Sequence, residues 1–129
     1  MNRAHNDEEW GEWYYAAGWI NGMVPSLPVP GNHEYCDGLS RNWRPTFALP
    51  LNGPAGLEET VYYLDYQGVR FIALNSNEKR ETQARWLEPV PAHNPNRWTI
   101  AVFHRPVFSA ARGRDNLHLR QLWMSVFDK

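Results

Sequence analysis

Pro30-Gly31-Asn32-His33-Glu34-Tyr35, directly after the apolar run Leu27-Pro28-Val29, is the stretch that decides the fold of this 129-residue chain. It places an amide oxygen on Asn32 and an imidazole on His33 side by side, in a loop that a glycine opens. Ligands and catalytic groups of open α/β folds gather at the ends of strands in this way. A neutral oxygen donor beside a potential proton donor is typical of metal-assisted hydrolysis.

A second candidate ligand follows another apolar run. His104 comes at the end of residues 98–103, which the pattern predicts as a buried strand, and Pro106 stiffens the chain after it. Asn32 and His104 together suit a divalent metal ion such as Mn, Fe or Zn, and His33 suits a general acid or a phosphate contact. Each also has a purely structural interpretation: Asn32 as a turn residue, His33 as an exposed loop histidine and His104 as a strand cap.

The remaining sequence alternates helical and extended patterns. Helices are expected over 7–21, 78–88 and 115–127, and strands over 23–29, 61–66, 69–74 and 98–103. The second and third of these strands form a hairpin around a Gln67-Gly68 turn. Residues 36–59 are expected to form a long loop. Trp10 and Trp13 fall at helical spacing and are expected to pack a helix against a sheet.

Composition sets wide limits on function. The chain is 43% hydrophobic and 21% charged, which is ordinary for a soluble globular protein. Its net charge of −1 gives no electrostatic signal for nucleic acid or an anionic membrane. The arginines are expected to be solvated surface charges; they include Arg41, Arg44, Arg70, Arg105, Arg112 and Arg114.

An ordered series of motifs resembles the calcineurin-like metallophosphoesterases, and most closely their purple acid phosphatase branch. The matching segments cover nearly the whole chain: 28–35, 47–50, 61–66, 69–75, 84–87 and 102–108. The resemblance implies an α/β fold, namely a partial metallophosphoesterase α/β sandwich with a mixed sheet flanked by helices. It also implies that residues 1–129 form a single, truncated phosphoesterase domain.

The same resemblance implies a metal-dependent phosphoester hydrolase, similar to the acid phosphatases. Asn32 and His104 match the asparagine and histidine that ligate one metal ion in the family. His33 matches the catalytic histidine that contacts the substrate phosphate and assists the leaving group. The implied cofactor is a dinuclear centre of iron, zinc or manganese, whose two ions stabilise the attacking and leaving oxygens. The implied substrate is a small phosphoester or a phosphorylated molecule, and the resemblance alone suggests an extracytoplasmic or secreted protein.

The chain departs from the family pattern in three motifs. The upstream Asp-x-His and Gly-Asp motifs and the downstream Gly-His-x-His motif have no counterpart in residues 1–129. We therefore expect an internal fragment that holds metal weakly and is inactive alone, because a catalytic zinc usually takes three protein ligands. A fragment of a sheet also exposes apolar edges, which are expected to promote homo-oligomers.

Two alternative hypotheses stay open. The chain can be a catalytically inactive binding or assembly module that retains the phosphoesterase fold, with residues 36–59 supplying aromatic and arginine contacts. It can also complete a site in trans, with a second chain contributing the remaining ligands. Metal content tests the first alternative, and dependence of activity on a second chain tests the other.

Overall fold

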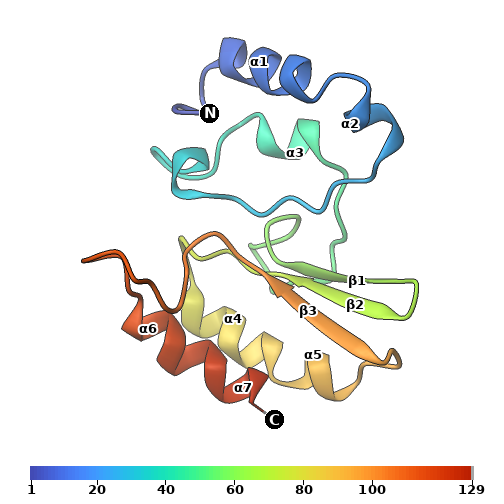
Figure 1. Cartoon of the computed structure of the whole chain (residues 1–129), viewed down its shortest axis with the longest axis vertical. Helices are drawn as coiled ribbons and strands as arrows, with labels where there is room; N and C mark the ends of the chain where they lie inside the picture. The colour runs from blue at the N-terminus through green and yellow to red at the C-terminus, as the bar shows by residue number, and fades with distance from the viewer. Residues whose placement is uncertain (129) are drawn as a thin grey trace.

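A three-stranded sheet lies across the middle of the molecule, in a computed structural model that describes residues 1–128 (Figure 1). Above it, in the view of Figure 1, are α1 (Asp7–Ala17), α2 (Ile20–Met23) and α3 (Trp43–Thr46). Below it are α4 (Arg80–Leu87), α5 (Pro89–Ala92), α6 (Leu117–Leu119) and α7 (Ser125–Phe127). The predicted class, an α/β fold with a mixed sheet flanked by helices, agrees with this arrangement.

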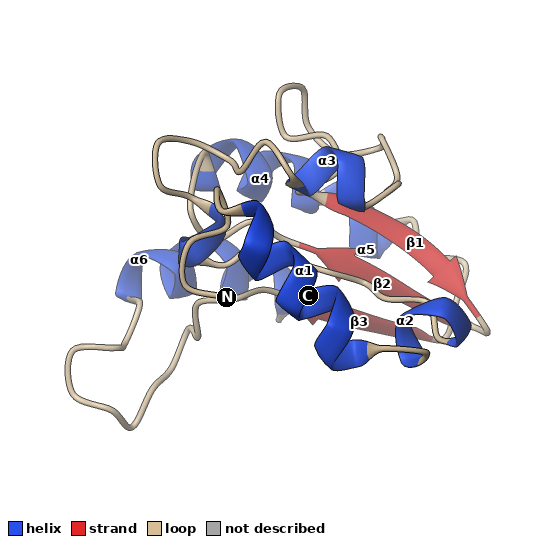
Figure 2. Cartoon of the chain, turned by 90° about the horizontal axis from the view of Figure 1, so that it is seen from above, coloured by secondary structure: helices blue, strands red, loops and turns tan. Residues whose placement is uncertain are grey.

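The sheet has the order β1 (Tyr62–Tyr66), β2 (Val69–Ala73), β3 (Trp98–Val102), as Figure 2 shows from above. β1 and β2 are antiparallel, whereas β2 and β3 are parallel. Gln67 and Gly68 have φ values of 48° and 80°, so both central residues of the turn are left-handed. Such turns match the twist of a two-residue hairpin, and the predicted hairpin is confirmed.

The main hydrophobic core lies between the sheet and the lower helices. Its buried members are Leu57, Val61, Ile72, Leu74, Leu87, Val90, Leu119, Trp123 and Val126. Phe103, just after β3, packs edge-on against Trp123 with ring centroids 5.3 Å apart. Apolar side chains of the helices near 78–88 and 115–127 therefore pack against the sheet. The last helix is interrupted, because a π-helical stretch over Arg120–Met124 separates α6 from α7.

The N-terminal helix ends earlier than the pattern predicts. α1 stops at Ala17 because Gly18 takes a φ of 49° and donates its N–H to Tyr14 O at 2.9 Å. The chain then turns and continues as the short helix α2. Glycine adopts this conformation without a Cβ penalty, which makes it a common residue at the end of a helix.

Trp10 and Trp13 pack within the upper layer and not against the sheet, contrary to expectation. Both lie edge-on to Phe47, with ring centroids 5.9 Å and 5.7 Å away. Trp43 of α3 lies 4.8 Å from the same ring. These contacts hold α1 against α3. Helical spacing identifies which residues face inward, but it does not identify the element that they face.

The segment 23–29, predicted as a strand, joins no sheet in the described chain. Pro25 and Pro28 have no N–H with which to pair, so the segment is poorly suited to a ladder. It contacts the sheet through the Tyr62 hydroxyl, which donates to Pro28 O at 2.8 Å. The expectation of a strand here is wrong.

The strand predicted as buried is an exposed edge. β3 pairs with β2 alone among the described strands, and its side chains Trp98 and Ile100 are 60% and 46% exposed. An apolar run alone does not show whether a strand lies at the centre of a sheet or at its edge. Association of copies through this edge stays a prediction.

Arg70 is buried, contrary to the surface role expected for the arginines. Its side chain is 7% exposed and donates to both oxygens of the Asp65 carboxylate at 2.8 Å. It also donates to Val90 O at 2.9 Å and to His93 O at 3.2 Å. The hydrogen bonds from Arg70 lower the pKa of Asp65. The pair thus connects the hairpin to α5.

Truncation of Leu74, which is fully buried, tests the placement of the core. We expect Leu74→Ala to lower the free energy of unfolding by about 2–5 kcal/mol, because it removes core contacts and leaves a cavity. Leu51→Ala is the matched control, since Leu51 is 70% exposed, and we expect a change within about 0.5 kcal/mol. Urea unfolding measures both variants. Equal effects of the two substitutions would contradict the core described here.

Candidate metal centre

A single helical turn, η1 (Asn32–Glu34), carries the first two candidate residues. Its entry is held by Glu34, whose carboxylate accepts the Gly31 N–H at 2.7 Å. Asn77, four residues after β2, donates its amide group to Pro30 O at 3.0 Å and Gly31 O at 3.1 Å. The loop is therefore clamped by its own carboxylate and by an amide from the end of the neighbouring strand.

His104 reaches the same place from the end of β3. Parallel strands end at the same edge of a sheet, and the β2–β3 pairing continues through Leu74 N–H, which donates to Val102 O at 2.9 Å. Arg105 N–H then donates to Ser76 Oγ at 3.1 Å. These bonds hold the chain on both sides of His104 against the end of β2.

Asn32 and His104 meet in a direct contact. Asn32 Oδ1 lies 2.8 Å from His104 Nε2, although the two residues are 72 positions apart in the sequence. An amide oxygen only accepts, so Nε2 donates the proton, and this proton has to leave before Nε2 binds a metal. Neighbouring ligands of an octahedral ion with bonds of about 2.1 Å lie about 3 Å apart, which is close to this separation.

The pair offers two donors and not a complete metal site. In residues 1–128 no three or more His, Cys, Asp or Glu side chains are grouped closely enough to hold an ion. Asn32 and His104 are therefore suited to one side of a coordination sphere, with further ligands required to complete it.

His33 lies on the same turn as Asn32 but makes a separate contact. Its Nδ1 is 2.7 Å from Asn2 O, and a carbonyl only accepts, so Nδ1 carries the proton. Nε2 is then the atom left for a proton transfer. His33 and His104 line one cavity of about 340 Å³, so the structure brings all three predicted residues to one region. Their catalytic and ligand roles stay predictions.

His104 also lines a second cavity, of about 350 Å³. Asn32, Arg105 and Arg114 line it, which makes it cationic. Arg105 Nε is buried and has no hydrogen-bond partner among the described residues. The sequence predicts a surface role for both arginines and does not reveal that they border the candidate site. Two guanidinium groups there favour an anionic guest.

Comparison with known families adds an independent observation. The family model of the calcineurin-like phosphoesterases matches residues 1–128. The chain belongs to this family. Members are generally hydrolases that depend on a dinuclear metal centre. Neither a comparison with curated proteins nor one with solved structures gave a significant match. Within residues 1–128, no helix is long and apolar enough to cross a bilayer.

A buried polar network supports the loop that carries Asn32 and His33. The Tyr35 hydroxyl donates to Glu78 Oε1 and accepts from Asn75 Nδ2, each at 2.6 Å. Asn75 is bound in turn through its backbone: its N–H donates to Gln83 Oε1 at 2.9 Å and its carbonyl accepts from Gln83 Nε2 at 2.7 Å. Sequence reasoning missed this network. The signal available was the polar run 75–77, directly after an apolar strand.

Gly31 is a close-packed position whose replacement tests the site. A Cβ there would lie 3.2 Å from the His104 ring and 2.9 Å from Glu34 Oε2. We expect Gly31→Ala to displace His104 from Asn32 and to cost about 1–3 kcal/mol of stability through overpacking. NMR signals of the His104 ring and urea unfolding measure the two effects.

Gly11→Ala is the matched control, because nothing lies within 4 Å of a Cβ at this helical position. It should leave the His104 signals unchanged and raise stability by roughly 0.5–1 kcal/mol. An unperturbed His104 ring in Gly31→Ala would contradict the packing around the site.

The stability of the protein should fall in alkaline solution. Burial, together with the hydrogen bond to the Glu78 carboxylate, raises the pKa of Tyr35 above its ordinary value of 10.0. The folded state therefore keeps a proton that the unfolded chain loses above about pH 10, and the free energy of unfolding decreases as pH rises further. Burial likewise raises the pKa of Tyr62.

The Tyr35→Phe variant should lose less stability than the wild type between about pH 9 and pH 11. At neutral pH it should be less stable by about 1–3 kcal/mol, because Asn75 and Glu78 lose their shared partner. Tyr15→Phe is the control, since Tyr15 is 89% exposed. Urea midpoints across this pH range give the result, and identical pH profiles for Tyr35→Phe and wild type would refute the assignment.

Proposed function

We propose that this chain contributes to a metal-dependent phosphoester hydrolase of the purple acid phosphatase-like branch. Asn32 and His104 act as ligands of one metal ion, and His33 acts on the leaving group. The observation that supports the proposal best is the 2.8 Å approach of Asn32 Oδ1 to His104 Nε2 from distant parts of the sequence. The ordered motifs of the sequence support the choice of branch.

The chain's own residues suit the binding and protonation steps. The cationic cavity beside Asn32, with Arg105 and Arg114, receives the anionic phosphoryl group. His33, held through Nδ1 by Asn2 O, presents Nε2 to the leaving oxygen and donates a proton to it when the imidazole is protonated. A bound metal centre supplies Lewis acidity and an activated water nucleophile.

We also propose that residues 1–128 supply only part of the metal centre. Because two donors converge in residues 1–128, the remaining ligands come from polypeptide outside them, and these residues alone hold metal weakly. An inactive binding module is the second candidate. It is favoured by the same shortage of ligands within residues 1–128 together with an intact cationic cavity.

Metal titration separates these candidates. We expect the 129-residue chain to bind Mn²⁺ or Zn²⁺ weakly by calorimetry, and Asn32→Ala and His104→Ala to weaken binding at least about tenfold. His93→Ala is the control, because His93 is exposed and its Nδ1 contacts only its own helix at Pro89 O. Binding of inorganic phosphate should increase when the metal is present.

Three results would count against parts of the proposal. Metal affinity that is unaffected by both substitutions would contradict the ligand assignment. Phosphate binding that does not depend on metal would favour the inactive module. Stoichiometric metal with turnover of an aryl phosphate by the chain alone would contradict the incomplete centre.

A further inference from the structure

The His33 ring is oriented by a hydrogen bond and not by packing. His33 is exposed, and its Nδ1 lies 2.7 Å from Asn2 O. An imidazole without a fixed acceptor exchanges between its two neutral tautomers, because the bond that one ring nitrogen makes sets the state of the other. The position of the Asn2 carbonyl therefore decides which nitrogen of His33 is left for the leaving oxygen.

Asn2 lies in a segment that no helix or strand fixes. Residues 1–3 belong to no regular element, and Asn2 and Arg3 are both exposed. Their backbone N–H groups instead converge on one carboxylate oxygen of Glu9, the third residue of α1. Arg3 N–H donates to Glu9 Oε2 at 2.9 Å, and Asn2 N–H donates to the same atom. A side chain of the helix thus holds the segment that carries the acceptor of His33.

We propose that Glu9 is a positioning residue for His33 and acts through the peptide group between Asn2 and Arg3. No peptide bond of residues 1–128 is cis, and the C=O and N–H of a trans peptide point in opposite directions. Because the N–H of Arg3 points to Glu9, the C=O of Asn2 points away from Glu9 and meets the His33 ring. This inference rests on the proposed function, which gives His33 its proton transfer.

The charge of Glu9 strengthens the same contact. The hydrogen bonds from Arg3 N–H and Asn2 N–H lower the pKa of Glu9, which is therefore a carboxylate at neutral pH. Hydrogen bonds to an ionised acceptor are stronger than those between neutral groups. A peptide that donates to a carboxylate becomes a better acceptor at its own oxygen, because hydrogen bonds in a chain polarise one another. Glu9 therefore favours the proton on His33 Nδ1.

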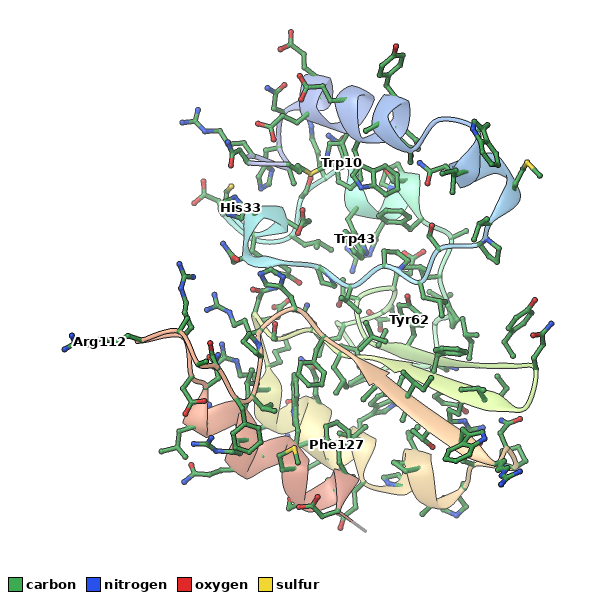
Figure 3. The ribbon with its side chains drawn as sticks, viewed as in Figure 1. Trp10, His33, Trp43, Tyr62, Arg112 and Phe127 are labelled. Atoms are coloured by element: carbon green, nitrogen blue, oxygen red, sulfur yellow. The ribbon has the colours of Figure 1, made fainter. Side chains whose placement is uncertain are left out.

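A second anchor holds the neighbouring backbone but does not orient the Asn2 carbonyl. Ala4 is fully buried, and its carbonyl accepts from the Trp10 indole N–H at 2.7 Å and from the Ser40 hydroxyl. Its N–H donates to His33 O at 3.2 Å. Figure 3 shows Trp10 and His33 in the same upper layer of the molecule. These bonds fix the backbone of Ala4 and His33, whereas the direction of the Asn2 carbonyl depends on the carboxylate.

The alternative is that Glu9 only stabilises the start of α1. A carboxylate in the first turn favours the positive end of the helix dipole. Glu8 lies in the same turn and carries the same charge. Within residues 1–128, no hydrogen bond joins the Glu8 side chain to residues 2–4. Substitution of Glu8 therefore separates an effect on the helix from an effect on His33.

NMR of the 129-residue chain tests the inference without metal or turnover. Long-range correlations between ring protons and ring nitrogens report the ratio of the two tautomers of neutral His33. We expect the Nδ1–H form to dominate in the wild type. Glu9→Ala should lower the ratio of Nδ1–H to Nε2–H about two- to tenfold, which corresponds to the loss of one hydrogen bond. Glu8→Ala is the matched control and should leave the ratio unchanged.

Two further variants distinguish positioning from helix stabilisation and serve should Glu9→Ala fail to fold. Glu9→Asp keeps the charge in the first turn but shortens the side chain by one methylene, so it should lower the tautomer ratio as Glu9→Ala does. Glu9→Gln keeps the length and an acceptor oxygen, so it should retain most of the wild-type ratio. A role in the helix dipole alone predicts the reverse order, because it depends on charge and not on length.

His104 is the internal control in every variant. It is held by Asn32 Oδ1 and by the bond from Arg105 N–H to Ser76 Oγ, and neither involves residues 2–4. Its ring signals should therefore stay unchanged when Glu9 is replaced. An unchanged His33 ratio in Glu9→Ala would overturn the inference. So would equal changes in both histidines, or a His33 ratio that follows the charge at position 9.

The outcomes also separate this inference from the proposed function. If metal binding requires Asn32 and His104 but the His33 ratio does not depend on Glu9, the inference fails and the proposed function stands. If the His33 ratio depends on Glu9 but metal affinity is unaffected by Asn32→Ala and His104→Ala, the ligand assignment fails and the positioning of His33 stands.

Discussion

The parallel pairing of β2 with β3 is the constraint on which the candidate site depends. It brings the ends of both strands to one edge of the sheet, so that His104 and the 75–77 segment emerge together. From there Asn77 and Asn75 bond to the loop that carries Asn32. A site assembled from distant segments thus rests on one strand register, because a slip of one residue would turn every side chain to the opposite face.

Hydrogen bonds from buried side-chain amides and from a tyrosine hydroxyl hold the loop at residues 30–35, which has no strand pairing of its own. Pro30 to Tyr35 is positioned by Asn77, Asn75 and its own Glu34, with Gln83 securing Asn75 from the helix side. Side-chain hydrogen bonds of this kind are directional, and each lost partner leaves another polar group unpaired in a region with little water. The loop is therefore held in one conformation, and Asn32 meets His104 in a defined geometry.

Several features could be predicted from local patterns, and others could not. The Gln67-Gly68 hairpin and the helices near 78–88 and 115–127 follow from turn chemistry and periodicity, which act over a few residues. The exposure of β3, the burial of Arg70 and the packing of Trp10 on Phe47 depend on which elements become neighbours. An apolar strand has the same composition at the centre of a sheet as at its edge. The position of Arg70 in the sequence does not reveal that the Asp65 carboxylate binds it across the hairpin.

The sequence by itself determined the family, the hairpin and the residues available as ligands, because motifs and turn signals are encoded in short segments. Only the tertiary structure decided that Asn32 and His104 touch, that Arg105 and Arg114 border them and that indoles line the space beside His33. These relations join residues tens of positions apart. They arise from strand register and side-chain packing, which no local pattern specifies.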